Sequence, residues 1–341
     1  MGEIRYRNRR AWKIEDQDTR VTVTVEGGHI AEILHKPTGI NPLWTPPWPS
    51  IEPSTHALET HPEYGADAES KLLSGIMGHN LCLDLFGGPS PEEAAAGMTV
   101  HGEASIVPYE ISAGDGQMTC RCRMPVAQLA FELRLRLAPG GVLNIEETVE
   151  NLSALDRPIA WTEHVTLGPP FLEKGATQFR TPAARSCTFA GVRYEWPDFP
   201  LPEGGTEDLR VYTDQPACGR YSAHLMDPAR EQAFFLAWSP ASKVLLGYVW
   251  RRADFPWLGM WDENYSRPAP PWGGRTLTRG LEFGVSPMAE SRRKMIERHS
   301  LFETPVYRWL PARTRAHVSY AAFIRTADSI PEEPDRVLTQ S

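Results

Sequence analysis

A long run of alternating residues in the middle of the chain constrains the fold more than any other feature. Between residues 129 and 137 apolar side chains occupy every second position, and charged or small residues fill the positions between them. The turn Pro139-Gly140-Gly141 then leads into a second alternating run over residues 142–151. Side chains of a strand point alternately to its two faces, so this pattern predicts a long antiparallel hairpin with one buried face.

Shorter runs of the same kind occur on both sides of this hairpin. Residues 21–26 and 29–34 flank Gly27-Gly28, a pattern typical of two strands joined by a primed turn. Further strands are predicted at residues 231–238, 243–250 and 316–324. Another predicted strand ends at residues 281–283. Only residues 288–299 indicate a helix, and the sequence has no internal repeat. We therefore predict one large antiparallel all-β domain over residues 1–341, with few short helices.

The charge balance and the apolar pattern exclude some classes of partner. The chain carries 35 Lys and Arg against 43 Asp and Glu, a net charge of −8. Nucleic-acid binding depends on clustered basic side chains, so this acidity disfavours it. No apolar run is long enough to span a bilayer, and the first residues lack the apolar core of a signal peptide. The five scattered cysteines are most simply explained by a reducing compartment, and we expect a cytoplasmic protein without a membrane partner.

Two elements in the first third of the chain place polar residues beside glycine. His79 and Asn80 follow a glycine, and His101 precedes one. Glycine lets a ligand approach the backbone closely, so both elements are candidates for a binding site. Between residues 41 and 64 the chain is rich in proline and tryptophan, which is typical of a long irregular loop. Its tryptophans either stack on a sugar or cap the end of the sandwich.

The segment 160–171 carries an acid and a histidine side by side. Glu163 and His164 lie among apolar and aromatic residues, and neighbouring side chains of a strand point to opposite faces, so only one of the two faces inward. An inward imidazole there is either a general acid or base, or a core histidine bonded to the backbone. A metal ion held by His79, His101 and His164 is possible by ligand type, but no spacing selects it. We expect no metal and no cofactor.

Two later segments add acids and aromatic residues. Glu282 lies between Leu281 and Phe283 in a predicted strand, and alternation turns it to the opposite face, where it is either solvated or functional. Trp261 and Asp262 belong to a run that interleaves aromatic residues with acids and amides. Such a mixture suits a sugar, because its ring stacks on apolar faces while its hydroxyls bond to polar groups.

These motifs together resemble those of the aldose 1-epimerase (galactose mutarotase) superfamily. The run 144–152 ends in Asn-Leu and leads through Arg157-Pro158 to Thr162-Glu163-His164, which is similar to the family's strand, turn and catalytic histidine. His101-Gly102 is similar to its first active-site His-Gly element, and Leu281-Glu282 is similar to the strand bearing its catalytic glutamate. The three elements occur in the family's order, and the resemblance spans most of the chain.

The resemblance implies a galactose mutarotase-like supersandwich with a sugar site on a concave face, and it implies a mechanism. In that mechanism Glu282 takes the proton of the anomeric hydroxyl while His164 protonates the ring oxygen. His101 would bind or polarise the ring and anomeric oxygens. The ring opens, the aldehyde rotates, and closure gives the other anomer, which requires an acid and a base on opposite sides of one hemiacetal. On this basis we expect His164 to be the inward group, with Glu163 behind it.

The chain departs from the family pattern where the substrate would be bound. The family's early arginine, which contacts sugar hydroxyls, is replaced by Gly78-His79-Asn80, and the residues that follow the histidine differ as well. Asp262 is loosely similar to the family's sugar-binding aspartate. We also expect Arg279 to recognise an anionic substituent, whereas Arg267 and Arg275 are expected to be surface residues. The predicted substrate-binding residues are His79, Asn80, Trp261, Asp262 and Arg279.

The sequence thus predicts an aldose 1-epimerase-like isomerase that acts on a small-molecule sugar, modified or anionic in one hypothesis, as a monomer or homodimer. Two alternatives remain open. A non-catalytic carbohydrate-binding protein would keep the groove but would not need a matched acid and base. A sugar lyase or hydrolase would need a second carboxylate opposite Glu282, which Asp262 or Glu263 could supply.

Overall fold

The alternating run forms the predicted long hairpin. In a computed structural model that describes residues 2–334, strand β8 (Leu129–Ala138) pairs antiparallel with β9 (Val142–Asn151), and Leu129 lies opposite Asn151. Leu129, Leu133 and Leu135 are buried, and the charged residues between them are more exposed. The hairpin therefore buries one face against the rest of the protein, as period-two alternation requires.

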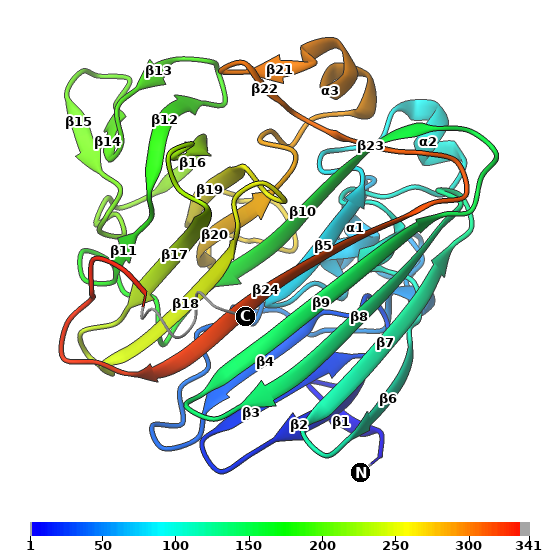
Figure 1. Cartoon of the computed structure of the whole chain (residues 1–341), viewed down its shortest axis with the longest axis horizontal. Helices are drawn as coiled ribbons and strands as arrows, with labels where there is room; N and C mark the ends of the chain where they lie inside the picture. The colour runs from blue at the N-terminus through cyan, green and yellow to red at the C-terminus, as the bar shows by residue number, and fades with distance from the viewer. Residues whose placement is uncertain (1, 335–341) are drawn as a thin grey trace.

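The hairpin belongs to the smaller of two large antiparallel sheets, which has eight strands (Figure 1). In spatial order these are β11 (Gln178–Arg180), β17 (Gln232–Trp238), β18 (Val244–Arg251), β24 (Arg315–Thr326), β9, β8, β7 (Gln117–Met124) and β6 (Glu110–Gly114). The predicted strands at 231–238, 243–250 and 316–324 are confirmed as the central members β17, β18 and β24.

The larger sheet has twelve strands. Eleven follow the order β1 (Ile4–Tyr6), β2 (Arg9–Glu15), β3 (Thr19–Thr24), β4 (Ile30–His35), β5 (His79–Asp84), β10 (Arg157–Leu167), β20 (Leu277–Gly284), β19 (Trp257–Asn264), β16 (Cys218–Met226), β12 (Ala183–Thr188) and β13 (Arg193–Tyr194). The twelfth, β23 (Arg308–Leu310), pairs with β10. The predicted hairpin around Gly27-Gly28 is confirmed as β3 and β4, and both glycines have positive φ.

Short elements complete the described part of the chain. Two-stranded pairs are formed by β14 (Asp198–Pro200) with β15 (Thr206–Asp208), and by β21 (Ser300–Leu301) with β22 (Thr304–Pro305). The helices are α1 (Ser70–Leu73), α2 (Pro91–Ala95) and α3 (Arg292–Arg298). Helix α3 lies inside the predicted 288–299 segment but is shorter, because Ser291 is extended and His299 has positive φ. Within residues 2–334, no helix is long and apolar enough to cross a bilayer.

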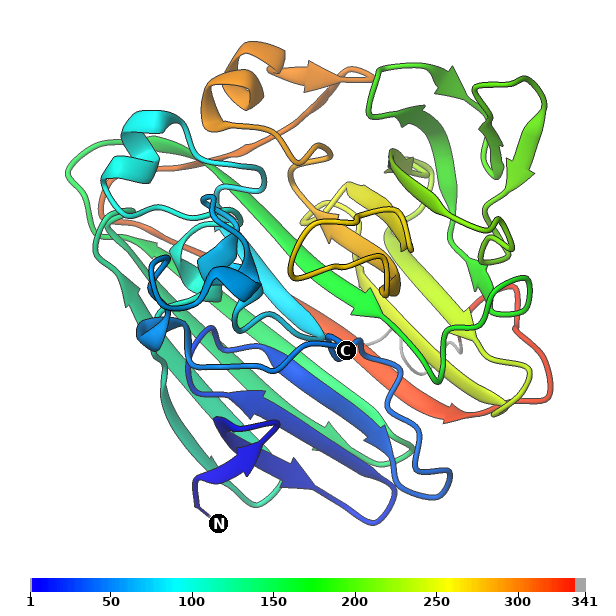
Figure 2. The same ribbon diagram turned by 180° about the vertical axis from the view of Figure 1, so that it is seen from behind.

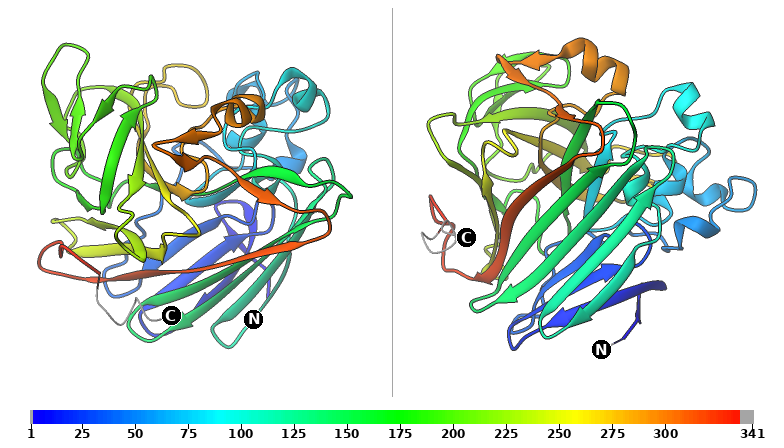
Figure 3. Two further views of the ribbon diagram at one scale, coloured as in Figure 1. Left: turned by 45° about the horizontal axis from the view of Figure 1, so that its top comes forward. Right: turned by 45° about the vertical axis from the view of Figure 1, so that its right-hand side comes forward.

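The two sheets pack face to face, with the main hydrophobic core between them (Figure 3). Strand β10 shows how the layers are separated. Its odd-numbered side chains, among them Trp161 and Val165, join the core cluster between the sheets. The even-numbered side chains, including His164, point to the other face of the larger sheet. The expectation that His164 would be the inward group is therefore wrong. Because side chains alternate along β10, Glu163 faces the interior of the sandwich and His164 faces the outer side of the sheet.

Irregular segments cover this outer face of the larger sheet. Figure 2 shows the loops between β4 and β5 and between β19 and β20 lying in front of β5 and β10. Trp44 and Trp48 from the first loop pack on Trp272 from the second, with ring centroids 6.0 and 5.2 Å away. The proline- and tryptophan-rich segment is therefore an ordered wall that rests on the sheet.

Candidate active site

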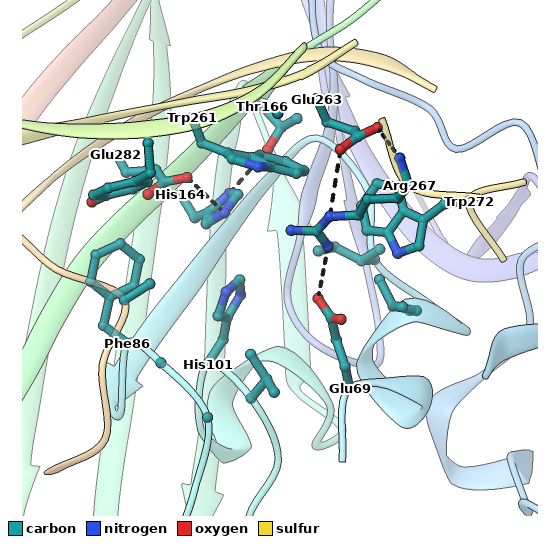
Figure 4. Close-up of a pocket in the computed structure, with 18 of the residues that line it drawn as sticks. Glu69, Phe86, His101, His164, Thr166, Trp261, Glu263, Arg267, Trp272 and Glu282 are labelled. Carbon is teal, nitrogen blue, oxygen red and sulfur yellow. Dashed lines mark hydrogen bonds and ion pairs between the residues drawn. The ribbon is translucent and has the colours of Figure 1, made fainter. Parts of the chain in front are cut away.

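A cavity of about 640 Å³ lies under these loops, on the outer face of the larger sheet (Figure 4). Its volume falls in the range of small-molecule sites. Residues from four separate parts of the chain line it: Glu69, His101, His164, Trp261, Arg267 and Glu282. The sheet order explains this meeting, since β5, β10 and the consecutive strands β20 and β19 are neighbours in space, although these three parts are far apart in sequence.

His164 and Glu282 form the floor of the cavity as a cross-strand pair. They lie directly opposite each other on β10 and β20, and His164 Nε2 is 3.0 Å from Glu282 Oε1. Both side chains are more than nine-tenths buried. The second carboxylate oxygen, Oε2, has no hydrogen-bond partner among the described residues, and the nearby Tyr221 hydroxyl donates to the Pro287 carbonyl instead. A buried carboxylate oxygen without a protein donor is left for a ligand group or a water molecule to bond.

Two glycines make room for this carboxylate. A Cβ atom at Gly280, two residues before Glu282 on the same face of β20, would lie 2.6 Å from Glu282 Oε1. A Cβ atom at Gly259, opposite Glu282 on β19, would lie 3.1 Å from Oε2 and 2.2 Å from the Tyr221 hydroxyl. The backbone around the carboxylate is therefore shaped by the absence of side chains.

His101 approaches from the other side and faces His164, with ring centroids 4.8 Å apart (Figure 4). His101 has a positive φ of 69°, an uncommon conformation for a residue with a side chain. The following Gly102 also has positive φ, and a Cβ atom there would lie 2.1 Å from the Leu83 carbonyl oxygen. The His-Gly element is thus required for a tight turn against β5, and this turn aims the imidazole into the cavity.

Asn80 orients His101 rather than lining the cavity. Its amide nitrogen lies 3.3 Å from His101 Nδ1 and 3.2 Å from Ser105 Oγ. If the amide donates to Nδ1, the proton of a neutral imidazole lies on Nε2. Burial, with His164 nearby, lowers the pKa of His101 well below its ordinary value. His101 is therefore a neutral hydrogen-bond donor near pH 7.

His79 lies on the opposite face of the sheet from this site. Neighbouring strand residues alternate, so Asn80 and His79 cannot both face the cavity. His79 Nε2 is 2.9 Å from Glu163 Oε2, and Tyr248 lies 3.2 Å from its Nδ1, inside the sandwich. The structure does not bring His79 to the cavity, so its predicted contact with substrate is not supported.

Asp262 and Arg279 are also turned away from the cavity. Arg279 is fully buried and binds Asp262 through two nitrogens, at 2.7 and 2.8 Å, and it donates to the Leu209 carbonyl. Asp262 also accepts from Arg220 at 2.9 Å. Asp262 and Arg279 pair with each other in the interior, and Arg279 does not line the cavity, so its predicted contact with an anionic substituent is not supported. Of the two predicted substrate-binding residues on β19, only Trp261 lines the cavity.

The sequence reasoning missed the far end of the cavity. Arg267, from the loop after β19, lies 4.6 Å from the Trp272 ring centroid and 5.3 Å from that of Trp261. It also approaches Glu263 and Glu69, at 3.5 and 3.6 Å. Arg267 is therefore a cavity residue and not the plain surface arginine that was expected. The one sequence signal for these cavity residues was that Trp261 and Glu263 are two positions apart on β19 and therefore share a face of the strand.

Comparison with known proteins identifies the fold. No protein-family description matches the sequence, and no curated protein matches it. Among solved structures, a protein from Klebsiella pneumoniae subsp. pneumoniae that is provisionally assigned as an aldose 1-epimerase has a TM-score of 0.67 at 17% identity. That alignment covers 94% of this chain and 80% of the other. The chain has the galactose mutarotase-like fold.

Two further structures with this fold match along their whole length. A galactose mutarotase-like protein from Clostridium acetobutylicum has a TM-score of 0.63 at 11% identity, covering 96% of this chain and 98% of that one. The Slr1438 protein from Synechocystis sp. PCC 6803 has a TM-score of 0.63 at 15% identity, covering 96% and 100%. At these identities the likeness concerns the galactose mutarotase-like fold, and function has to be argued from the cavity.

Proposed function

We propose that the protein is an aldose 1-epimerase-like isomerase that interconverts the anomers of a sugar. One observation carries the proposal: His164 Nε2 and Glu282 Oε1 lie 3.0 Å apart on the floor of a cavity, and Glu282 Oε2 has no partner among the described residues. An acid and a base that share one buried surface can act on two oxygens of the same hemiacetal. A binding protein would not need this pairing.

In the proposed reaction Glu282 Oε2 accepts the proton of the anomeric hydroxyl. The C1–O1 bond becomes a carbonyl, the bond between C1 and the ring oxygen breaks, and His164 donates a proton to that oxygen. Rotation about C1–C2 presents the other face of the aldehyde, and the reverse transfers close the ring. On closure Glu282 returns its proton to O1 and His164 recovers one from the ring-oxygen hydroxyl, so the enzyme ends in its starting state.

His101 contributes a fixed hydrogen-bond donor in this scheme. Its neutral imidazole, held by Asn80, lies beside that of His164 in the cavity lining, with ring centroids 4.8 Å apart. A donor oriented in advance stabilises charge that develops on an oxygen without reorganisation during the reaction. Thr166 Oγ1, 3.0 Å from His164 Nδ1, holds the second imidazole in place. These contacts support assigning His101 to binding and polarisation and His164 to proton transfer.

The cavity gives less support to a hydrolase. Glycosidic cleavage needs a second free carboxylate across the cavity from the first. Glu263 lines the cavity, but its oxygens accept from the Ser266 and Arg267 backbone nitrogens and from the Ser266 hydroxyl, at 2.7, 3.0 and 2.6 Å. Asp262 is bound by two arginines in the interior. Neither of the two carboxylates that the sequence predicted for this role is free to serve as the second group.

Anomer exchange measured by saturation-transfer NMR over a panel of aldoses tests the proposal. We expect the wild type to accelerate exchange of at least one sugar, and Glu282→Gln and His164→Ala to slow it about 10²–10⁴-fold, the usual contribution of a general acid or base. Glu146→Gln and His317→Ala change exposed residues of the smaller sheet and should leave the rate unaltered. No acceleration of any sugar, or full activity in both site variants, would overturn the assignment.

A further inference from the structure

The charges around the cavity bear on which sugars it accepts. Three carboxylates line it, those of Glu69, Glu263 and Glu282, against the two guanidinium groups of Arg220 and Arg267. Arg220 is engaged by Asp262 and Glu207, at 2.9 and 3.0 Å. Arg267 also pairs with two acids, but at the longer distances of 3.5 Å to Glu263 and 3.6 Å to Glu69. The residues around Arg267 therefore determine whether the cavity can bind an anionic sugar.

Arg267 is held by aromatic faces and by two acids at longer range. Its guanidinium lies over Trp272 and Trp261, and Figure 4 shows Glu263 and Glu69 on either side of it. Both acid contacts are 3.5 Å or longer, and the side chains of Arg267 and Glu69 are 40% and 32% exposed. An arginine positioned by stacking keeps donors available for a ligand. Glu69 likewise presents acceptor oxygens on the same side of the cavity.

We infer that Glu69 and Arg267 form the specificity determinant of the cavity, binding adjacent hydroxyls of a neutral sugar and disfavouring anionic sugars. The inference rests on the proposed function, since it places the anomeric centre at His164 and Glu282. A hydroxyl both donates and accepts, so two neighbouring hydroxyls can satisfy a carboxylate and a guanidinium together. A carboxylate or phosphate substituent would instead meet the charges of Glu69 and Glu263, and like charges brought together lower affinity.

The same geometry predicts how the preference can be reversed. Glu263 is already bonded to the loop that carries Arg267, through Ser266 and the backbone. Neutralising Glu69 would therefore leave Arg267 with one distant acid and with donors directed at the cavity. Glu69→Gln keeps the shape of the side chain and removes its charge, while one acceptor oxygen is replaced by an amide donor. The variant should gain affinity for anionic sugars and lose affinity for neutral ones.

Binding of D-glucose, D-galactose and D-mannose and of their uronates, measured by titration calorimetry and ligand-observed NMR, tests the inference. We expect the wild type to bind at least one neutral hexose about tenfold more tightly than its uronate. In Glu69→Gln this ratio should fall at least tenfold, and Arg267→Gln should weaken binding of both members of the pair. Glu63→Gln and Arg275→Gln, matched changes at exposed positions outside the cavity, should leave the ratio unchanged.

The outcomes separate this inference from the proposed function. Repeating the titrations in Glu282→Gln measures binding without turnover. Sugar binding with the expected switch but no anomer exchange would overturn the isomerase and keep the specificity determinant. Anomer exchange in the wild type, together with a hexose-to-uronate affinity ratio that Glu69→Gln does not change, would keep the isomerase and overturn the specificity determinant. A wild type that prefers the uronates, or that binds no sugar of either class, would overturn the inference.

Discussion

At the scale of single residues, the position of Glu282 depends on a glycine. Gly280 precedes Glu282 by two residues on the same face of β20, and a Cβ atom there would lie 2.6 Å from Oε1. The atom that must move is the end of a flexible side chain, so the fold can accommodate an alanine while the carboxylate shifts. A displacement near 1 Å at a reacting group can cost up to about 10²-fold in rate.

We therefore predict that Gly280→Ala lowers the anomer-exchange rate at least tenfold while the free energy of unfolding changes by less than about 1.5 kcal/mol. Exchange NMR and urea denaturation measure the two quantities. Gly114→Ala is the control, because no atom lies within 4 Å of the corresponding Cβ position and the site is in another sheet. Unchanged exchange in Gly280→Ala would show that the carboxylate tolerates displacement.

Single residues also show where sequence reasoning succeeds and fails. His101, His164 and Glu282 were predicted from short motifs, and the structure brings them to one cavity. His79 and Arg279 were placed with them because a histidine or arginine near polar residues looks the same in sequence whether it faces a ligand or an interior partner. Strand parity could have rejected His79 once Asn80 was assigned to the site, but the partner of Arg279 requires knowledge of strand pairing.

At the scale of an element, β10 serves both faces of its sheet. Its outward residues form the floor of the cavity, while Trp161 and Glu163 face the sandwich interior. There the Tyr320 hydroxyl lies 2.7 Å from Glu147 and 3.1 Å from Glu163, and Trp161 Nε1 lies 3.1 and 3.2 Å from the same two carboxyl groups. Two acids sharing these partners in a buried site favour retention of a proton.

This interior cluster predicts a pH-dependent contribution to stability. Burial raises the pKa of Glu163 to about 7 from 4.5, so the folded state holds a proton that the unfolded chain releases. The contribution is complete below pH 4.5 and is lost as the pH rises toward 7, by up to on the order of 1 kcal/mol per pH unit.

In Glu163→Gln the loss of stability that Glu163 causes between pH 4.5 and 7 should disappear. The difference in unfolding free energy between wild type and variant should decline from pH 4.5 to 7, measured by urea denaturation at each pH. Glu146→Gln, an exposed acid on β9, should give a difference that does not change with pH. A constant difference for Glu163→Gln would mean that the carboxyl is ionised throughout.

At the scale of the whole molecule, the fold was predictable and the assembly of the site was not. Alternation fixes which face of each strand is buried, which is enough to indicate a large antiparallel β domain, and the family resemblance implied the sandwich. The cavity, however, depends on β5, β10, β20 and β19 being neighbours, an order that no periodicity encodes. Its far end is built by Glu69 and Arg267 in irregular segments, where no pattern relates sequence to direction. The family resemblance indicated that His101, His164 and Glu282 meet, but it did not indicate Glu69 and Arg267.

The protein also buries histidines whose neutral form is favoured in the folded state. Burial lowers the pKa of His29 and His224 to about 3 and that of His79 to about 4. The unfolded chain binds a proton at each below pH 6.5, so stability is lost as the pH falls from 6.5 toward these values. Each histidine accounts for about 1 kcal/mol between pH 6.5 and 5.5. Protonation of Glu163 stabilises the folded state as the pH falls, but the loss of stability from the three histidines is larger.

His224 isolates this effect because it lies away from the cavity. Its ring nitrogens are 2.9 and 3.0 Å from the hydroxyls of Ser186 and Ser222, which glutamine can also bond. We expect wild-type stability to fall between pH 6.5 and 5, and His224→Gln to remove about one proton from the slope of unfolding free energy against pH. His317→Gln, an exposed histidine on β24, should leave the slope unchanged. An unaltered slope in His224→Gln would mean that the buried imidazole takes up its proton without unfolding, and that the interior carries charge more readily than its packing implies.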